Sequence, residues 1–262
     1  MLRTVINHAT VAELVVGTIA GTVCVVLIGI WLIRRLVPAT REGFDAEVSS
    51  QMLGVVASLL GLLLAFVIVI EYQNFVGAQD NVGQEADSLA AMTRDSHALT
   101  PAQGARVRGA IGTYVRTVVA DEWPQLREGR SSAKAWNDVD RIYAALESAK
   151  PTTPQATAFY SDSVRQLNTA LIARRDRLSA ANGGLPSLVL TLIVVGALVI
   201  LGYAMLVGSR NFWFHTIGAC SIALVVALSL VVLVDLSYPF SGSLNVSSTP
   251  FQTGVLAQFF HK

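Results

Sequence analysis

The apolar residues of the chain gather in long stretches instead of being spread along it. No Asp, Glu, Lys or Arg occurs in four of these stretches, at residues 14–33, 48–70, 178–209 and 211–234. Each is long enough for a helix to cross the hydrocarbon core of a bilayer, which takes about 20 apolar residues. We therefore predict transmembrane helices, and not the buried helices of a large soluble core, at about residues 14–33, 52–70, 188–207 and 212–234.

Between the second and third stretches, residues 71–184 are rich in charges of both signs and carry apolar residues at helical spacing. Thr100-Pro101 and Thr153-Pro154 each match an N-cap residue followed by proline at the first helical position. The pattern predicts a helical soluble domain. Its apolar stripes are Val107, Ile111, Tyr114 and Val118, then Trp136, Val139, Tyr143 and Leu146, then Tyr160, Val164, Leu167 and Leu171.

The second apolar stretch has no proline or other strong break after it. Phe75, Val82 and Leu89 repeat every seven residues, which is typical of a helix packed along a partner helix. We predict one helix from about residue 47 to about residue 98, with these three side chains against a partner. The fold class is then an all-α integral membrane protein with four transmembrane helices. A first pair of membrane helices lies in residues 1–70, and the soluble domain follows at residues 71–184. The second pair of membrane helices lies in residues 185–234, and a C-terminal segment occupies residues 235–262.

The composition supports this class. Hydrophobic residues make up 53% of the chain and charged residues 14%, whereas a soluble domain carries nearer a quarter. The 19 basic and 18 acidic residues give a net charge of +1, which argues against a nucleic-acid binder. Four spans place both termini and the soluble domain on one side of the membrane, and Arg34 and Arg35 beside the first span favour the side outside the cytoplasm.

The sequence contains no recognisable catalytic, cofactor or metal motif. The four histidines lack metal-ligand spacing, and no phosphate-binding loop or dinucleotide fingerprint is present. We therefore expect no enzyme, no cofactor and no bound metal. The Asp121-Glu122 pair is more typical of a solvated helix end than of a catalytic site. Glu85 interrupts the apolar spacing of its helix, so we expect it beside water or a basic neighbour such as Arg165 or Arg174.

Small residues recur at a spacing of four in three of the predicted membrane helices. Such rows let helix backbones approach closely, either within one subunit or between subunits. They are Gly17 with Gly21, Gly54 with Ser58, Ala57 with Gly61, and Ala219 with Ala223 and Ala227.

The segment after the fourth span, DLSYPFSGSLNVSSTPF at residues 235–251, begins with an acid and a Pro-Phe-Ser-Gly turn. Asp235 is expected at the water boundary, Pro239 ends the helix and Gly242 permits the turn. Thr249-Pro250 then predicts a short amphipathic C-terminal helix that lies on the membrane or on a neighbouring subunit. Its apolar face consists of Phe251, Val255, Phe259 and Phe260.

Several stretches in order along the chain resemble the bestrophin-like family of bacterial membrane proteins. They are RRLVP at 34–38, LLLAFVIVIEYQNF at 62–75, QEADSL at 84–89, DEWPQL at 121–126, RRDRL at 174–178, LP at 185–186 and PFSG at 239–242. This family is distantly similar to bestrophins, which are pentameric anion channels with a pore lined by the second membrane helix. The resemblance thus implies a homo-oligomer in the lipid bilayer of a bacterial cell membrane, with small anions as its cargo.

In bestrophins a Pro-Phe-Gly turn after the last span leads into an acidic calcium clasp. Pro239, Phe240 and Gly242 resemble this turn, and with Asp235 they are candidates for a gate or a structural turn. Residues 243–249 hold no carboxylate, so the calcium clasp does not carry over. The resemblance also suggests a pore face on the second helix, with a hydrophobic constriction at Phe66. The candidate lining residues are Ser58, Gly61, Leu62, Ala65 and Phe66.

Two functions follow as hypotheses. The first is an oligomeric, anion-permeable channel, and the second is a membrane-anchored scaffold or sensor that acts through its helical soluble domain. Arg174, Arg175 and Arg177 are a candidate cluster for anions or lipid headgroups, or alternatively a group of side chains that snorkel at the membrane edge.

Overall fold

The computed structural model of the chain describes residues 11–36, 46–206, 212–242 and 244–260. Every regular element within these ranges is a helix, and four of the helices are long and apolar enough to cross a membrane. The predicted class, an all-α integral membrane protein with an inserted helical domain, is confirmed. The described residues divide into a membrane unit, which holds residues 11–36, 46–73, 184–206 and 212–237, and a soluble unit, which holds residues 74–183, 238–242 and 244–260.

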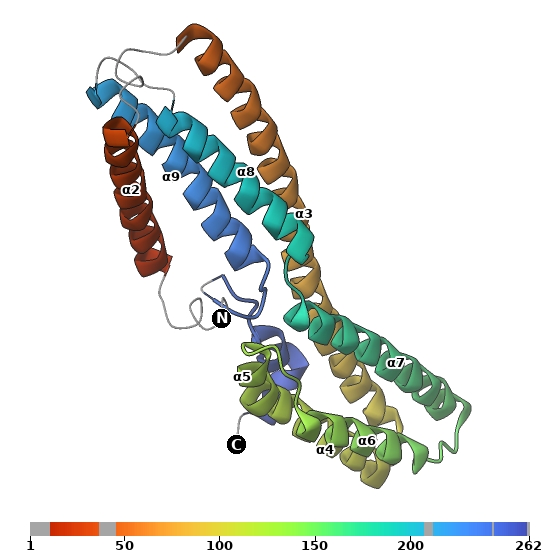
Figure 1. Ribbon diagram of the computed structural model, residues 1–262. Coiled ribbons are helices and arrows are strands. Elements are labelled where there is room, and N and C mark those ends of the chain that lie inside the picture. Colours follow the sequence, from red (N-terminus) through yellow and green to blue (C-terminus); the bar gives the residue numbers. More distant parts are fainter. Residues whose placement is uncertain (1–10, 37–45, 207–211, 243, 261–262) are drawn as a thin grey trace. The chain divides into compact units, whose positions relative to one another are not determined.

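In the membrane unit, helices α2, α8 and α9 lie side by side, and the first part of α3 packs along α8 (Figure 1). The predicted end of the third span, Val207, lies outside the described residues. The bounds of these helices are Val11–Leu36 for α2, Ala46–Asp95 for α3, Ser187–Leu206 for α8 and Phe212–Leu236 for α9.

Two apolar clusters hold the membrane unit together. Leu60 and Leu64 of α3 are buried against α8, and a Cβ at Gly196 of α8 would come within 2.9 Å of Leu60. Ala219 and Ala223 of α9 pack against α2, so this predicted row of small residues works within one chain. Four other small positions, which are Gly17, Gly21, Gly54 and Gly61, have no atom within 4 Å of a Cβ built on them.

The soluble unit is a helical bundle around the second part of α3. That helix is continuous from Ala46 to Asp95 and is followed by a single 3₁₀ turn, which confirms the predicted long helix. The other elements are η2 (Ser96–Ala98), α4 (Pro101–Thr117), a π-helical turn η3 (Val118–Glu122), α5 (Trp123–Leu126), α6 (Ala133–Glu147), α7 (Pro154–Asn182), and two 3₁₀ helices, η4 (Thr249–Gln252) and η5 (Gly254–Phe259).

The core of this unit agrees with most of the predicted stripes. Val82 and Leu89 of α3 are fully buried, and Phe75 packs against the same cluster. All four members of the stripe on α4 and η3 are buried as well. On α6 the stripe is only half right, because Trp136 and Tyr143 are 39% and 43% exposed and lie at the edge of the core.

The C-terminal segment differs from its prediction. It forms two 3₁₀ helices, not one amphipathic helix, and Phe251 and Leu256 are buried in the core of the soluble unit. Gly254, the first residue of the second of these helices, has a φ of +59°, a backbone conformation that a single continuous helix does not contain. The segment therefore completes the core of its own chain, although Phe260 stays 37% exposed.

Two glycines of α4 predict opposite effects of the same substitution. A Cβ at Gly104 would overlap the backbone carbonyl oxygen of Ser96, whereas a Cβ at Gly109 would meet nothing within 4 Å. Gly104→Ala should destabilise the protein by about 1–3 kcal/mol through steric strain. Gly109→Ala should stabilise it by up to about 1 kcal/mol, because alanine favours a helix. Thermal melts of the detergent-purified variants will measure both, and shifts of equal sign would contradict the packing described for α4.

Candidate functional site

The membrane part of α3 has one packed face and one open face. Leu60 and Leu64 point toward α8 and are 7% and 5% exposed. Because successive residues of a helix are turned by about 100°, Ser58, Leu62 and Phe66 fall on the opposite side, and Gly61 and Ala65 lie between that side and the packed one. Of these, Leu62 and Phe66 are 56% and 62% exposed. The structure thus brings Ser58, Leu62 and Phe66 together on one uncovered face, while the role of the candidates in lining a pore stays a prediction.

This open face offers hydrocarbon surface without charge. The hydroxyl of Ser58 donates to the Gly54 carbonyl oxygen at 2.8 Å, so its hydrogen is used within the helix. Gly61 and Ala65 form one wall of an apolar groove whose other wall is α9. The nearest acid along α3, Glu71, is 8% exposed and lies on the packed side. A face of this kind can contact lipid, pack on a neighbouring chain or border a water-filled path.

The predicted turn after α9 is fixed to the soluble unit by its own side chains. Phe240 is 2% exposed and packs edge-on against Trp123 of α5, with ring centroids 5.6 Å apart. The hydroxyl of Ser241 donates to the Arg127 carbonyl oxygen at 2.7 Å. Gly242 has a φ of +75°, which explains glycine at this position. These contacts give the turn a structural role within the soluble unit.

Pro239 and Asp235 are the other two residues predicted as a gate or a structural turn. The Pro239 carbonyl oxygen accepts from the Val246 backbone N–H at 2.8 Å, which closes the loop that follows. Asp235 belongs to the last turn of α9 in the membrane unit and is 7% exposed, so it is covered by its own chain, and its place at the water boundary stays a prediction.

The predicted headgroup cluster on α7 is wrong for two of its three members. Arg174 and Arg177 are 0% exposed, and only Arg175 lies on the surface. Residues three apart share one face of a helix, and here that face is turned into the core. A buried guanidinium can neither reach a lipid headgroup nor snorkel at the membrane edge.

Instead, the two buried arginines form a network with two glutamates. Arg177 donates from Nε to Glu85 Oε2 at 2.8 Å, and from Nη2 to Glu122 Oε2 at 2.8 Å. Arg174 donates from Nη2 to Glu122 Oε1 at 2.6 Å. All four side chains are fully buried, and their charges balance. The basic neighbour of Glu85 is therefore Arg177, and Glu122 is not a solvated helix end.

Aromatic rings surround the two guanidinium groups. The Cζ of Arg174 lies 4.1 Å from the ring centroid of Trp136. The Cζ of Arg177 lies 5.4 Å from the ring centroid of Trp123 and 5.8 Å from that of Phe251. The negative faces of aromatic rings attract cations at such distances. Trp136 is at the edge of the core because it covers Arg174, which is why the predicted stripe on α6 fails there.

The network shifts the pKa values of its members. Burial raises the pKa of the Glu122 carboxyl, but Arg177 and Arg174 outweigh burial and hold this pKa below its ordinary value of 4.5. Burial, followed by the negative charge of Glu85, raises the pKa of Tyr114 well above its ordinary value of 10.0. Tyr114 thus keeps its proton, and its hydroxyl donates a hydrogen bond to Glu85 Oε1. Burial lowers the pKa of Arg177, but Glu85 and Glu122 more than compensate and raise it.

These observations assign the network a structural role. It joins α3, η3 and α7, and no group of three or more potential metal ligands occurs among the described residues. The π-helical turn places Glu122 inside, since the extra residue of such a turn shifts the register of the side chains that follow. From the sequence alone, the two signals were an acid that interrupts an apolar repeat and two arginines at a spacing of three.

Comparison with known proteins decides the family. A family model described as the Bestrophin-like domain matches residues 20–251. The chain belongs to the bestrophin-like family. The predicted resemblance is thereby confirmed, and with it an integral membrane protein of the bestrophin-like fold. A comparison with curated proteins finds no match.

Solved structures of similar fold are bacterial bestrophin homologues from Klebsiella pneumoniae. One point mutant has a TM-score of 0.70 and 10% sequence identity, with coverage of 94% of this bestrophin-like chain and 99% of the homologue. A second crystal structure has a TM-score of 0.69 and 12% identity, covering 94% and 97%. A third has a TM-score of 0.63 and 13% identity, covering 97% and 100%. At such low identity the likeness concerns the fold.

The network predicts that replacing Arg177 strongly lowers the stability of the protein and that a second substitution restores part of it. Arg177→Met should destabilise the protein by about 3–5 kcal/mol, because it leaves Glu85 buried without its cation. Adding Glu85→Gln removes that charge, so the double variant should be more stable than Arg177→Met alone. Arg175→Met on the exposed side of α7 is the matched control and should change stability by less than about 0.5 kcal/mol. Melting temperatures give the comparison, and equal effects of the Arg175 and Arg177 variants would contradict the network.

Glu122 predicts how stability depends on pH. Its folded pKa lies below its unfolded value of 4.5, so its contribution is fully present above about pH 4.5. The free energy of unfolding should fall as the pH is lowered from 4.5 toward the folded pKa. In Glu122→Gln this position binds no proton, so the stability of the variant should fall less over the same interval. Denaturant unfolding between pH 3 and pH 7 will test this, and parallel curves would show that Glu122 is not held ionised.

Proposed function

We propose that the protein is a subunit of an oligomeric, anion-permeable channel of the bacterial cell membrane. The observation that carries this proposal is the open face of α3 in the membrane unit, which is uncharged and opposite the packed side of the same helix. Membership of the bestrophin-like family supports it.

Assembly of several copies follows from where this face lies. Leu62 and Phe66 point away from the partners of α3 within the chain, so one copy cannot enclose them. Copies arranged by a closed rotation would bring the same face of each α3 to a common axis. The glycines at positions 54 and 61, which leave space for another backbone, favour such close approach.

Permeation by anions follows from the chemistry of the face. It contains no carboxylate that would repel an anion, and its small residues leave a wider path than leucines would. Phe66 is the largest side chain of the set and can form a hydrophobic constriction that opens and closes by wetting. The positive edge of its ring also interacts favourably with a passing anion.

Phe66 gives the electrical test of this proposal. Purified protein in a planar bilayer should conduct chloride, and Phe66→Ala should increase the single-channel conductance severalfold because the constriction widens. Leu198→Ala is the control, because Leu198 is 63% exposed on α8, outside the open face of α3. Silence of the wild-type protein over a range of voltage and pH, or equal effects of both variants, would contradict the proposal.

Cysteine accessibility supports the same test without conduction. In a background with Cys24→Ala and Cys220→Ala, a membrane-impermeant thiol reagent should modify Leu62→Cys and leave Leu198→Cys unmodified. Equal modification of both would mean that the open face of α3 meets lipid and not water.

A further inference from the structure

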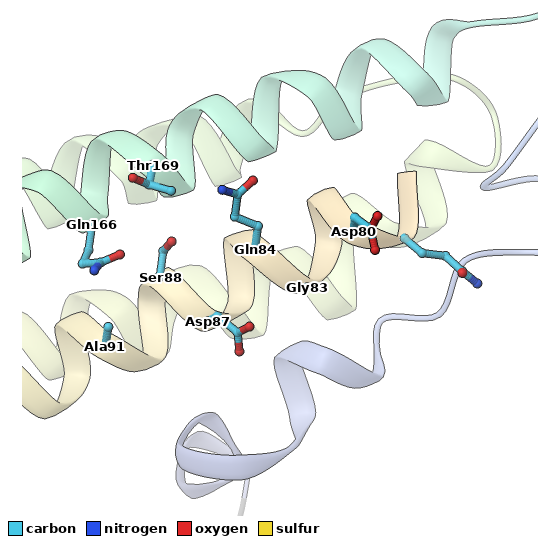
Figure 2. A pocket seen from close by; sticks show the side chains of 9 residues that line it. Asp80, Gly83, Gln84, Asp87, Ser88, Ala91, Gln166 and Thr169 are labelled. Atoms are coloured by element: carbon cyan, nitrogen blue, oxygen red, sulfur yellow. The ribbon is translucent and has the colours of Figure 1, made fainter. Parts of the chain in front are cut away.

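A polar groove runs between α3 and α7 on the surface of the soluble unit. It has a volume of about 720 Å³. In Figure 2 the side chains of Gln84 and Ser88 rise from α3 toward α7, from which Gln166 and Thr169 face them. Asp80 and Asp87 of α3 also line the groove.

The residues that line the groove include Asp80 and Asp87 and no basic residue. The next basic residue along α3 is Arg94, two turns beyond Asp87. Glu85 is used in the buried network, whereas Asp80 and Asp87 are exposed and form no ion pair with any described residue. Ser88 is 4% exposed, and its hydroxyl faces the groove without a hydrogen bond to the described part of the chain. The oxygen atoms of these side chains can accept hydrogen bonds from donor groups of a partner.

Helix α4 presents the opposite charge on its outer side. It contains three arginines and no acid, and Arg106 and Arg116 are exposed, although Arg116 also donates to the Phe259 carbonyl oxygen of its own chain at 3.3 Å. Gly109 lies on the same outer side and leaves room for close approach. At 1.5 Å per residue, Asp80 and Asp87 are about 10 Å apart along α3 and the two arginines about 15 Å apart along α4, a difference that flexible arginine side chains can span.

We propose that the groove between α3 and α7 of one copy receives the outer face of α4 from the next copy. Pairing of the groove with itself would set the aspartates of both copies against each other, and like charges at an interface repel. A contact between two different faces is heterologous, and heterologous contacts that close by rotation generate rings. This inference rests on the oligomeric channel proposed above and specifies the surface through which its soluble units meet.

Charge reversal tests the interface on the full-length protein in mild detergent. Asp80→Lys with Asp87→Lys should convert the oligomer to smaller species, as should Arg106→Glu with Arg116→Glu. All four substitutions together should restore the oligomer. Asp140→Lys with Glu147→Lys, at exposed positions of α6, is the matched control and should leave the oligomer intact. Light scattering gives the mass, and unchanged melting temperatures show that the variants are folded.

Cross-linking supplies a second readout. With both native cysteines replaced by alanine, Asp80→Cys and Arg106→Cys in one chain should give a ladder of linked subunits with a flexible bis-maleimide. Either cysteine alone should give no ladder.

The possible failures are distinguishable. A wild-type protein that is monomeric in detergent and does not conduct overturns the channel proposal. A wild-type oligomer whose mass is unchanged by both charge reversals overturns the interface alone. The interface is also overturned if reversal of the arginines lowers the oligomer mass, reversal of the aspartates does not, and the four substitutions together do not restore it. In that case α4 would bind something other than the groove.

Discussion

The soluble unit depends on two guanidinium groups buried beside two carboxylates. Removing such charges from water costs several kcal/mol per ion, and only close and well-directed partners recover it. Here Arg177 bridges Glu85 and Glu122, and Arg174 completes the pairing. Three guanidinium nitrogens still find no hydrogen-bond acceptor among the described residues, and the aromatic rings beside them supply part of what is missing. The network accepts few alternative arrangements, so it specifies how α3, η3 and α7 meet.

The membrane unit is held together by different forces. Its helices pack through leucine, isoleucine and alanine, and Leu60 comes close to Gly196. The soluble unit depends instead on its buried ion-pair network. Lipid tails are as apolar as these side chains, so shape and not hydrophobicity decides which helices touch. One side of α3 finds no partner within the chain, and the candidate function rests on that side.

The sequence was sufficient for the fold class, because soluble domains rarely contain several charge-free stretches long enough to cross a bilayer. The heptad-like repeat likewise identified Val82 and Leu89 as core residues. Residue patterns failed for Arg174 and Arg177, which resembled charges at the membrane edge, and for Glu122, which resembled a solvated helix end. The partners of Arg177 are 55 and 92 positions away along the chain, and no local pattern reveals them.

The resemblance pointed to the second membrane helix, and residue spacing then identified the open face of α3, because residues on one side of a regular helix stay together whatever surrounds them. What covers that face depends on contacts beyond one chain, which residue spacing does not encode. The C-terminal segment was misjudged for a local reason, since the positive φ of Gly254 interrupts the helix and Leu256, outside the predicted apolar face, is buried in the core.

The division of the soluble unit between two distant parts of the chain has a consequence for biosynthesis. Phe240, Phe251 and Leu256 belong to a core whose buried residues mostly precede α8. A ribosome makes the chain from its N-terminus, so α8 and α9 are synthesised before these three side chains exist. Until translation ends, the earlier part of the bundle has an uncovered apolar surface beside Trp123. The soluble unit therefore cannot close until α8 and α9 have been synthesised, and during that interval its uncovered core is open to chaperones and proteases.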